Sequence, residues 1–122
     1  ISILDKIKKI NSLISQHEEE IANPILKYID NNENLKLIGK NKIYKKNRAP
    51  TISFVSNKIS SKKLANKLVE NKIATRNDNF YAWRCLNALG INVNDGVIRI
   101  SLTHYNNAQE IKNLISVLDK IL

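Results

Sequence analysis

The spacing of apolar residues changes along this chain of 122 residues, and that change restricts the fold more than any other feature. Near the amino terminus the apolar residues recur at the spacing of one helix face, and they are Ile3, Ile7, Ile10, Ile14 and Ile21. Between residues 97 and 102 they recur at every second position, which is the spacing of one face of a strand. A chain with both periods is expected to pack helices against a sheet.

Residues 1–30 are predicted to form a long linking helix that begins at Ile3. Pro24 lacks a backbone N–H and clashes with the preceding turn, so we expect the helix to kink or restart there, with Asn23 as a cap. His17 falls on the apolar stripe, where a histidine is more often a partly buried packing residue than a ligand. The sequence therefore predicts a packing role for His17.

Four short segments have the composition of strands, at residues 35–38, 51–55, 73–76 and 97–102. The first is apolar and is closed by Gly39. In the second, Ile52 and Phe54 point to one side and the intervening residues to the other, which predicts a half-buried strand. The basic stretch 40–49 between them is predicted to be a loop.

Two helices are predicted in the middle of the chain. Ser60 is a suitable N-cap, and the helix after it is expected to bury Leu64, Leu68 and Val69 and to end at Asn71. Residues 77–80 are then expected to form a loop, and residues 81–89 a short helix that Gly90 stops. The side chains expected to anchor this short helix in the core are Trp83 and Leu86.

A final helix is predicted after Asn106, which is expected to be its N-cap, with Gln109 three residues later completing a capping box. Its apolar stripe consists of Ile111, Leu114, Ile115, Leu118 and Leu122. Helices and strands thus alternate along residues 1–122, which is a suitable length for one domain. We predict an α+β two-layer sandwich with a three- to four-stranded, mostly antiparallel sheet and helices on one face.

The formal net charge of +9 raises the alternative of a basic module that binds nucleic acid. The basic residues are scattered, however, except in the loop from Lys40 to Arg48, and only Tyr44 could stack on a base there. The use of Lys, Asn and Ile together is also typical of an AT-rich genome. The loop is therefore a weak candidate for contacts with phosphate.

The sequence offers no metal site and no disulfide, because Cys85 is its only cysteine and no cluster of Cys and His has ligand spacing. We expect Cys85 to have a structural role. Neither a membrane-spanning run nor a signal peptide is found, which predicts an intracellular, cytoplasmic location. The chain begins with Ile1 and has no Met, so it is expected to be a piece of a longer protein.

Arg99 is the candidate site residue that the pattern alone picks out, because it is a full charge in the middle of an apolar strand. It lies on the opposite side from Ile98 and Ile100, together with polar residues such as Ser53 of the second strand. A guanidinium on a strand is a rigid partner for a carboxylate, through two parallel hydrogen bonds. The alternative is an ion pair with an acidic residue of the same domain.

Residues 96–106, Gly-Val-Ile-Arg-Ile-Ser-Leu-Thr-His-Tyr-Asn, resemble a segment near the C-terminus of class V aminotransferases and cysteine desulfurases. In that family an arginine on the strand is followed by Ser and then by Tyr-Asn before the final helix. Residues 48–54 are similar to the strand that opens the small domain of the family, and residues 73–76 look like the strand before its active-site loop. The His-Tyr-Asn form is most similar to the branch called cysteine desulfurase-like proteins.

The resemblance implies a fold type I enzyme that depends on pyridoxal phosphate, in which Arg99 binds the α-carboxylate of an amino-acid substrate. It implies weaker substrate contacts from Arg76 and Asn77, in or near a loop, residues 77–81, that closes over the substrate. Desulfurases of the family carry a nucleophilic cysteine at the position where this chain has Tyr81. Cys85 lies one helical turn further on, and we expect it to be buried.

The family places its cofactor lysine and phosphate site in a large domain that has no counterpart in these 122 residues. We therefore expect no catalytic residue, no cofactor site and no metal here, and no activity from this domain alone. The full-length protein is expected to be a homodimer that binds pyridoxal phosphate. Its substrate, and its reaction among desulfuration, transamination, epimerisation and lyase chemistry, are left open by the sequence.

Overall fold

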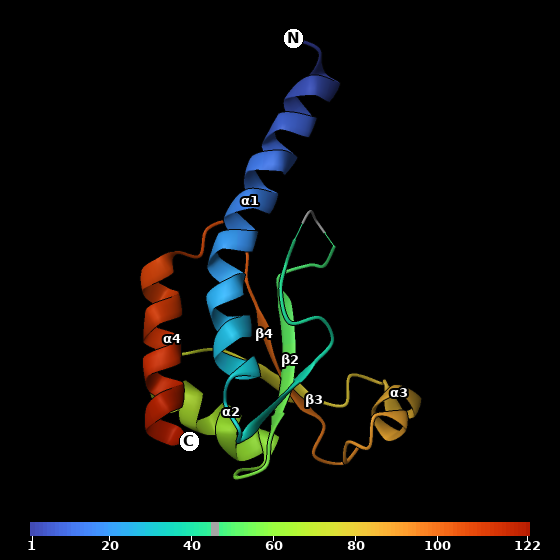
Figure 1. The fold of residues 1–122 in the computed structure, drawn as a ribbon, viewed down its shortest axis with the longest axis vertical. Helices are drawn as coiled ribbons and strands as arrows, with labels where there is room; N and C mark the ends of the chain where they lie inside the picture. Colours follow the sequence, from blue (N-terminus) through green and yellow to red (C-terminus); the bar gives the residue numbers. More distant parts are fainter. Residues whose placement is uncertain (45–46) are drawn as a thin grey trace.

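A computed structural model describes residues 1–44 and 47–122 (Figure 1). These residues form four helices and four strands, which are in chain order α1 (Ile3–Asp30), β1 (Leu35–Ile38), β2 (Thr51–Ser56), α2 (Ser61–Glu70), β3 (Arg76–Asp78), α3 (Trp83–Ala88), β4 (Val97–Ser101) and α4 (Ala108–Ile121). The order agrees with the predicted alternation of helices and strands.

The strands form one sheet in the order β1-β2-β4-β3, and each neighbouring pair is antiparallel. In the register, Phe54 of β2 lies opposite Ile98 of β4, and Ile52 lies opposite Ile100. Side chains directly opposite each other in an antiparallel pair lie on the same face, so these four form one apolar surface. The predicted α+β fold with a long first helix is confirmed.

The main core lies between that surface and helices α1, α2 and α4. Ile52, Phe54 and Ile98 are completely buried, and so are Leu64 and Leu68 of α2. Each such side chain contributes about 1.5–3 kcal/mol through its burial. Tyr28 of α1 also joins α4, because its hydroxyl donates a 2.8 Å hydrogen bond to Asp119; burial and then this carboxylate raise the pKa of Tyr28 to about 12.

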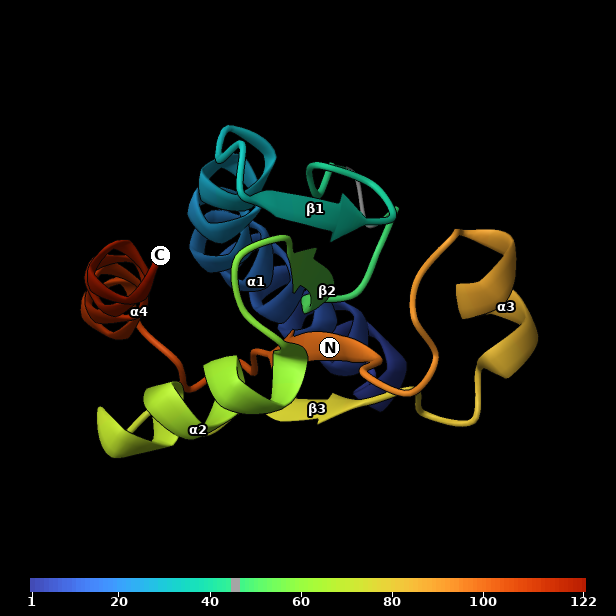
Figure 2. The same cartoon turned by 90° about the horizontal axis from the view of Figure 1, so that it is seen from below.

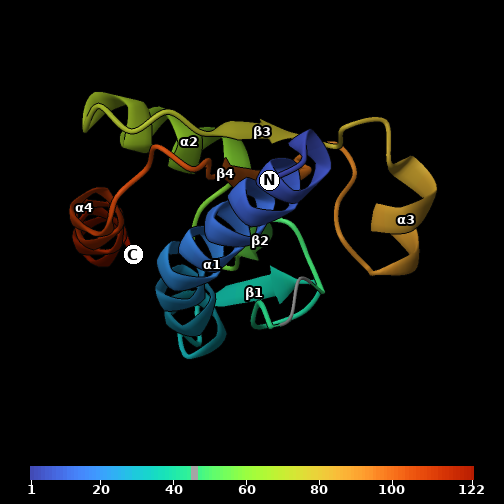
Figure 3. The same cartoon turned by 90° about the horizontal axis from the view of Figure 1, so that it is seen from above.

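Helix α3 lies beyond the end of β3, on the side of the molecule away from α4 (Figure 2 and Figure 3). Its contribution is Leu86, which is buried in a second, smaller cluster with Ile91 and Val97. Leu86 therefore anchors α3 as expected. The expectation for Trp83 is wrong, because its side chain is 51% exposed: a helix of six residues that holds to the domain through one side leaves its other positions in solvent.

Helix α1 continues through Pro24 as one helix, so the expected restart there does not occur. Asn23 does not cap a second helix. Its side chain bonds the backbone of Ile43 twice, accepting from N–H at 2.7 Å and donating to C=O at 3.1 Å. The buried neighbours Ile25 and Leu26 hold the helix beyond the proline, which explains how it tolerates the missing N–H.

Two other predicted boundaries differ from the structure. The third strand is Arg76–Asp78 rather than 73–76, because Lys72 turns with φ 61° and the N–H of Ile73 bonds the carbonyl of Leu68 to close α2. The chain therefore reaches the edge of β4 only at Arg76. Val69 was predicted to be buried but is 61% exposed, since it lies beside the inward face that Leu64 and Leu68 define.

The N-cap of α4 is Asn107, one residue later than predicted. Its side chain accepts from the N–H of Glu110 at 3.0 Å, and the carboxylate of Glu110 accepts from the N–H of Asn107 at 3.0 Å. Hydrogen bonds from the side chain of Asn106 and then from the backbone of Asn107 lower the pKa of Glu110. The ionised carboxylate of Glu110 stabilises the start of α4. Because its pKa is lowered, this stabilisation is complete above the ordinary carboxyl pKa and is lost as the pH falls through the lowered value.

The capping box gives a first testable prediction. Replacing Asn107 with Ala should lower the free energy of unfolding by about 1 kcal/mol, because it removes the oxygen that accepts from the first turn of α4. The matched control is Gln109→Ala, which should change stability by less than about 0.5 kcal/mol. Urea denaturation of both variants measures the difference, and a larger loss in the Gln109 variant would contradict the observed cap.

Candidate functional site

The candidate site is built on the face of the sheet opposite the main core. Ile98 and Ile100 of β4 point into that core and are buried, so Arg99 between them points to the other face, where it is half-buried. The register places Ser53 of β2 directly opposite Arg99 on one side and Arg76 of β3 directly opposite it on the other. Ser53, Arg99 and Arg76 thus form one row, which we call the arginine row.

The guanidinium of Arg99 stacks on an aromatic ring. Its central carbon lies 4.3 Å from the centroid of the Phe80 ring, which is within the range of a cation–π interaction. Its Nε atom is buried and has no hydrogen-bond partner. Within residues 1–44 and 47–122, no ion pair or hydrogen bond joins the Arg99 side chain to another residue. The structure therefore does not contain the alternative ion pair considered for Arg99 among its described residues.

Phe80 reaches Arg99 from a turn in an unusual backbone conformation. Phe80 and the next residue, Tyr81, both have positive φ, at 52° and 59°. Non-glycine residues in this region cost about 1–3 kcal/mol each, and such strain persists only where the surrounding structure enforces it. Asn79 supplies part of that enforcement, because its side chain accepts from the N–H of Tyr81 at 3.0 Å and donates to the carbonyl of Val93 at 3.3 Å.

Gly96 allows the turn to lie against the start of β4. It has φ 69°, and a Cβ built on it would lie 2.3 Å from the carbonyl carbon of Asp78, much closer than atoms can approach. Only glycine fits at this position. The backbone of β4 and the turn therefore approach closely, and this places Phe80 beside Arg99.

The arginine row contains two of the three residues predicted to bind substrate. Arg99 and Arg76 are brought together, with Arg76 exposed at the edge strand. Asn77 lies opposite Ile98 in the register, so its side chain belongs to the helix-covered face, and the structure does not bring it together with Arg99. Phe80 was not identified from the sequence as an Arg99 partner; the one available signal was a pair of aromatic residues within a polar loop.

Tyr81 and Cys85 are both exposed. Tyr81 is 97% exposed at the tip of the turn. The expectation that Cys85 is buried is wrong: α3 turns only Leu86 inward, and the free thiol of Cys85 faces solvent. The sequence could not show this, because the apolar residues around Cys85 look like core residues until the position of α3 is known.

The exposure of Cys85 gives a second prediction. The thiol should react completely with an aromatic disulfide reagent in the folded protein, at a rate close to that of the denatured protein. A spectrophotometric count of released thiolate measures both rates. A Cys85→Ser variant supplies the blank, and a native rate more than about 100-fold slower, as protection by folding produces, would place Cys85 in the interior.

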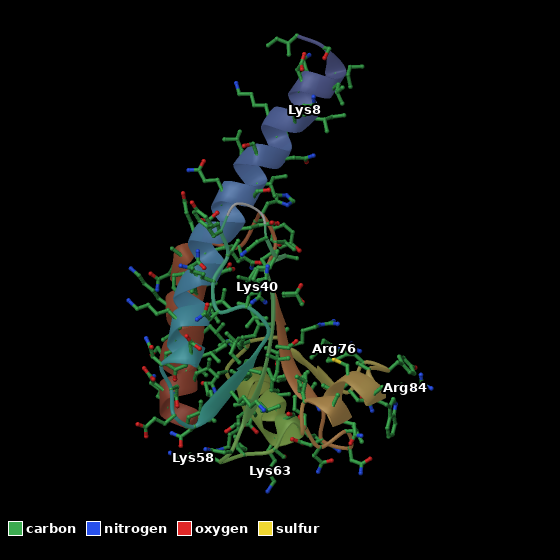
Figure 4. The ribbon with its side chains drawn as sticks, turned by 45° about the vertical axis from the view of Figure 1, so that its right-hand side comes forward. Lys8, Lys40, Lys58, Lys63, Arg76 and Arg84 are labelled. Carbon is green, nitrogen blue, oxygen red and sulfur yellow. The ribbon has the colours of Figure 1, made fainter. Side chains whose placement is uncertain are left out.

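The arginine of the basic loop between β1 and β2 makes its hydrogen bonds within this part of the chain. The guanidinium of Arg48 donates to the backbone carbonyls of Lys40, Ala49 and Thr51, the last at 2.7 Å, and burial lowers its pKa. These bonds use one donor on each guanidinium nitrogen and leave fewer donors for a phosphate. Lys45 and Lys46 lie outside the described residues. Of the lysines labelled in Figure 4, Lys8 lies near the free end of α1, Lys40 near the middle of the molecule, and Lys58 and Lys63 at the opposite end.

The lysines of the described residues differ in environment from a lysine that carries pyridoxal phosphate. A lysine that carries this cofactor needs a buried, desolvated position, and every lysine within residues 1–44 and 47–122 is exposed. The same part of the chain has no group of three His, Cys, Asp or Glu side chains that could hold a metal ion. It also has no helix that is both long and apolar enough to span a membrane.

The fold and the arginine row together define a small α+β domain with two neighbouring arginines on the sheet face opposite the main core. Residues 2–114 match the model of the aminotransferase class-V family, and the chain therefore belongs to that family. The resemblance seen in the sequence is thereby confirmed. A curated relative is the aminotransferase-like protein FGM3 of Gibberella zeae, 28% identical over 111 residues, which are 89% of this chain and 27% of the relative.

Solved structures of similar fold include cysteine desulfurases. The enzyme from Thermococcus onnurineus has a TM-score of 0.79 at 22% identity, over 96% of this chain and 28% of that one. A NifS-like protein from Rickettsia africae has a TM-score of 0.73 at 18% identity, over 90% of this chain and 29% of that one. The chain thus spans between a quarter and a third of the length of these relatives.

Proposed function

We propose that this chain is the substrate-binding C-terminal domain of an enzyme that uses pyridoxal phosphate, and that Arg99 binds the carboxylate of an amino-acid substrate. The observation that carries this proposal is the state of the Arg99 guanidinium. It is half-buried, stacked on Phe80 and without an ionic partner among the described residues. A charge held in this way is available to an anion from outside the domain.

The contacts of Arg99 suit it to a planar carboxylate. Phe80 covers one face of the guanidinium, so the donors at its edges are the part left for a ligand. Two parallel N–H bonds from such an edge match the two oxygens of a carboxylate. Because β4 and the Phe80 ring fix the side chain, little conformational entropy is lost when substrate binds. Ser53, next to Arg99 in the row, adds a hydroxyl that is able to donate.

The cofactor belongs to a large domain of the same protein in this proposal. Membership of the family and the solved cysteine desulfurases of similar fold support it, and so does the share of those chains that this domain covers. Bound pyridoxal phosphate would act as the electron sink for the reaction. The domain described here binds the carboxylate of the substrate and thereby orients it for the reaction. In this proposal the domain is inactive alone. We further propose that the complete protein is a cytoplasmic homodimer.

The identity of the residue at position 81 bears on the reaction. A phenol cannot accept sulfur as a thiolate does, so Tyr81 does not provide the persulfide chemistry that the family resemblance assigns to a cysteine at that position. Cys85 is exposed on α3, beyond the turn. The proposal therefore extends to binding of an amino acid and leaves its conversion to be assigned by assay.

The role of Arg99 is tested in the complete protein. Arg99→Ala should lower kcat/KM for the amino-acid substrate about 100-fold or more, because a charged hydrogen-bonded pair is lost. Arg99→Lys should recover part of it, since a lysine keeps the charge but not the fork of donors. The cofactor absorbance should stay unchanged in both variants, and Arg84→Ala, at an exposed position on α3, is the control. Equal losses in the Arg84 and Arg99 variants would refute the assignment.

The first half of α1 supports a contact with the large domain. It projects beyond the sheet (Figure 1), and it exposes an apolar stripe. The large side chains of that stripe, with their exposed fractions, are Ile3 at 78%, Leu4 at 60%, Ile7 at 47%, Ile10 at 55% and Leu13 at 60%. Exposed apolar patches on one helix face mark surfaces that another protein part covers. We assign this stripe to the large domain.

The stripe gives a fourth prediction. Ile10→Asp should leave the unfolding free energy of this domain within about 0.5 kcal/mol of the parent, because the side chain is exposed here. In the complete protein the same change should lower the thermal midpoint by several degrees, since it would bury a charge. The matched control is Lys8→Asp, on the polar side of the same helix. Equal shifts for the two variants in the complete protein would contradict the contact.

A further inference from the structure

Arg76 and Arg99 are cross-strand neighbours, which is an unfavourable arrangement for two cations. They lie directly opposite each other in the antiparallel pair of β3 and β4, on the same face of the sheet. The Cβ atoms of such a pair are about 4.5–5.5 Å apart, and like charges placed this way destabilise the sheet. An arrangement of this kind needs either solvent screening or an anion that both cations share.

Neither arginine is neutralised within the described part of the chain. No ion pair or hydrogen bond of the Arg76 or Arg99 side chain is found among residues 1–44 and 47–122. The acidic residue nearest to them in the register is Asp78, two positions along β3, and its carboxylate accepts from the N–H of Asn79 at 2.7 Å. The pair therefore has no ion-pair partner among the described residues.

Solvent screening is weakened at Arg99. Phe80 covers one side of its guanidinium, and the Nε atom is buried without a partner. Arg76, by contrast, is exposed, and no hydrogen bond or ion pair among the described residues holds its side chain in place. An anion on Arg99 thus has a second, exposed cation on the neighbouring strand. A ligand with one negative charge can neutralise one of the two arginines. A ligand with two negative charges can neutralise both.

We propose that the arginine pair selects an amino acid with an acidic side chain, of the aspartate or glutamate type, with Arg99 on the α-carboxylate and Arg76 on the second acid group. This inference rests on the proposed function of Arg99. It adds the substrate class and makes Arg76 the residue that determines it. The reach required of Arg76 is short, because the two acid groups of such an amino acid are separated by only one or two methylene carbons beyond the α-carbon.

The test uses the complete protein with its cofactor and four probes of matched size: aspartate, asparagine, glutamate and glutamine. The cofactor absorbance reports the dissociation constant of each, so no knowledge of the reaction is required. The acidic members should bind about tenfold or more tightly than their amides. Arg76→Ala should remove this preference while leaving the amide affinities unchanged, and Arg76→Lys should keep most of it.

The outcomes of this experiment distinguish a failure of this inference from a failure of the proposed function. Arg99→Ala should weaken all four probes, and if it weakens none, the assignment of Arg99 to the carboxylate fails. If Arg99→Ala weakens all four but the parent protein binds aspartate no better than asparagine, only the acidic selectivity fails. Selectivity also fails if Arg76→Ala weakens acid and amide equally, because both arginines would then hold the same carboxylate.

Discussion

The structure depends on the placement of β4 between β2 and β3, with its side chains alternating between two different environments. Ile98 and Ile100 close the main core against the helices, and this burial fixes which way the strand faces. Once that face is fixed, Arg99 has to project from the other side. A one-residue slip in register would bury the charge and expose both isoleucines, so hydrophobic packing also determines where the cation lies.

The uncovered face is organised by a second, smaller set of contacts. Leu86 of α3 packs with Val97 and Ile91, and this holds the segment after β3 against the end of the sheet. Gly96 lets the backbone of that segment approach β4 closely. The result is a strained turn that places the ring of Phe80 on the guanidinium of Arg99. The strained backbone therefore lies at the candidate site, where the contact with Phe80 restrains the charged side chain of Arg99.

Local patterns predicted the parts of this chain that local physics controls. The alternation in β2 and β4, the Ser60 cap of α2 and the end of that helix at Asn71 depend on neighbours within a few residues. The N-cap of α4 and the start of β3 differed from the prediction through local hydrogen bonds, whereas the predictions for α3 differed because of how that helix sits on the domain. Trp83 and Cys85 lie in an apolar sequence but are exposed, because α3 presents only Leu86 to the domain.

The sequence by itself determined the fold class, the face of the sheet that carries Arg99 and the family, because periodicity and one contiguous segment encode all three. Only the tertiary structure decided that Arg76 stands beside Arg99, that Asn77 points away and that Phe80 stacks on the guanidinium. These facts depend on strand register and on a turn that lies close against β4 because residue 96 is glycine. Register is set by packing between segments distant in sequence, so no local pattern contains it.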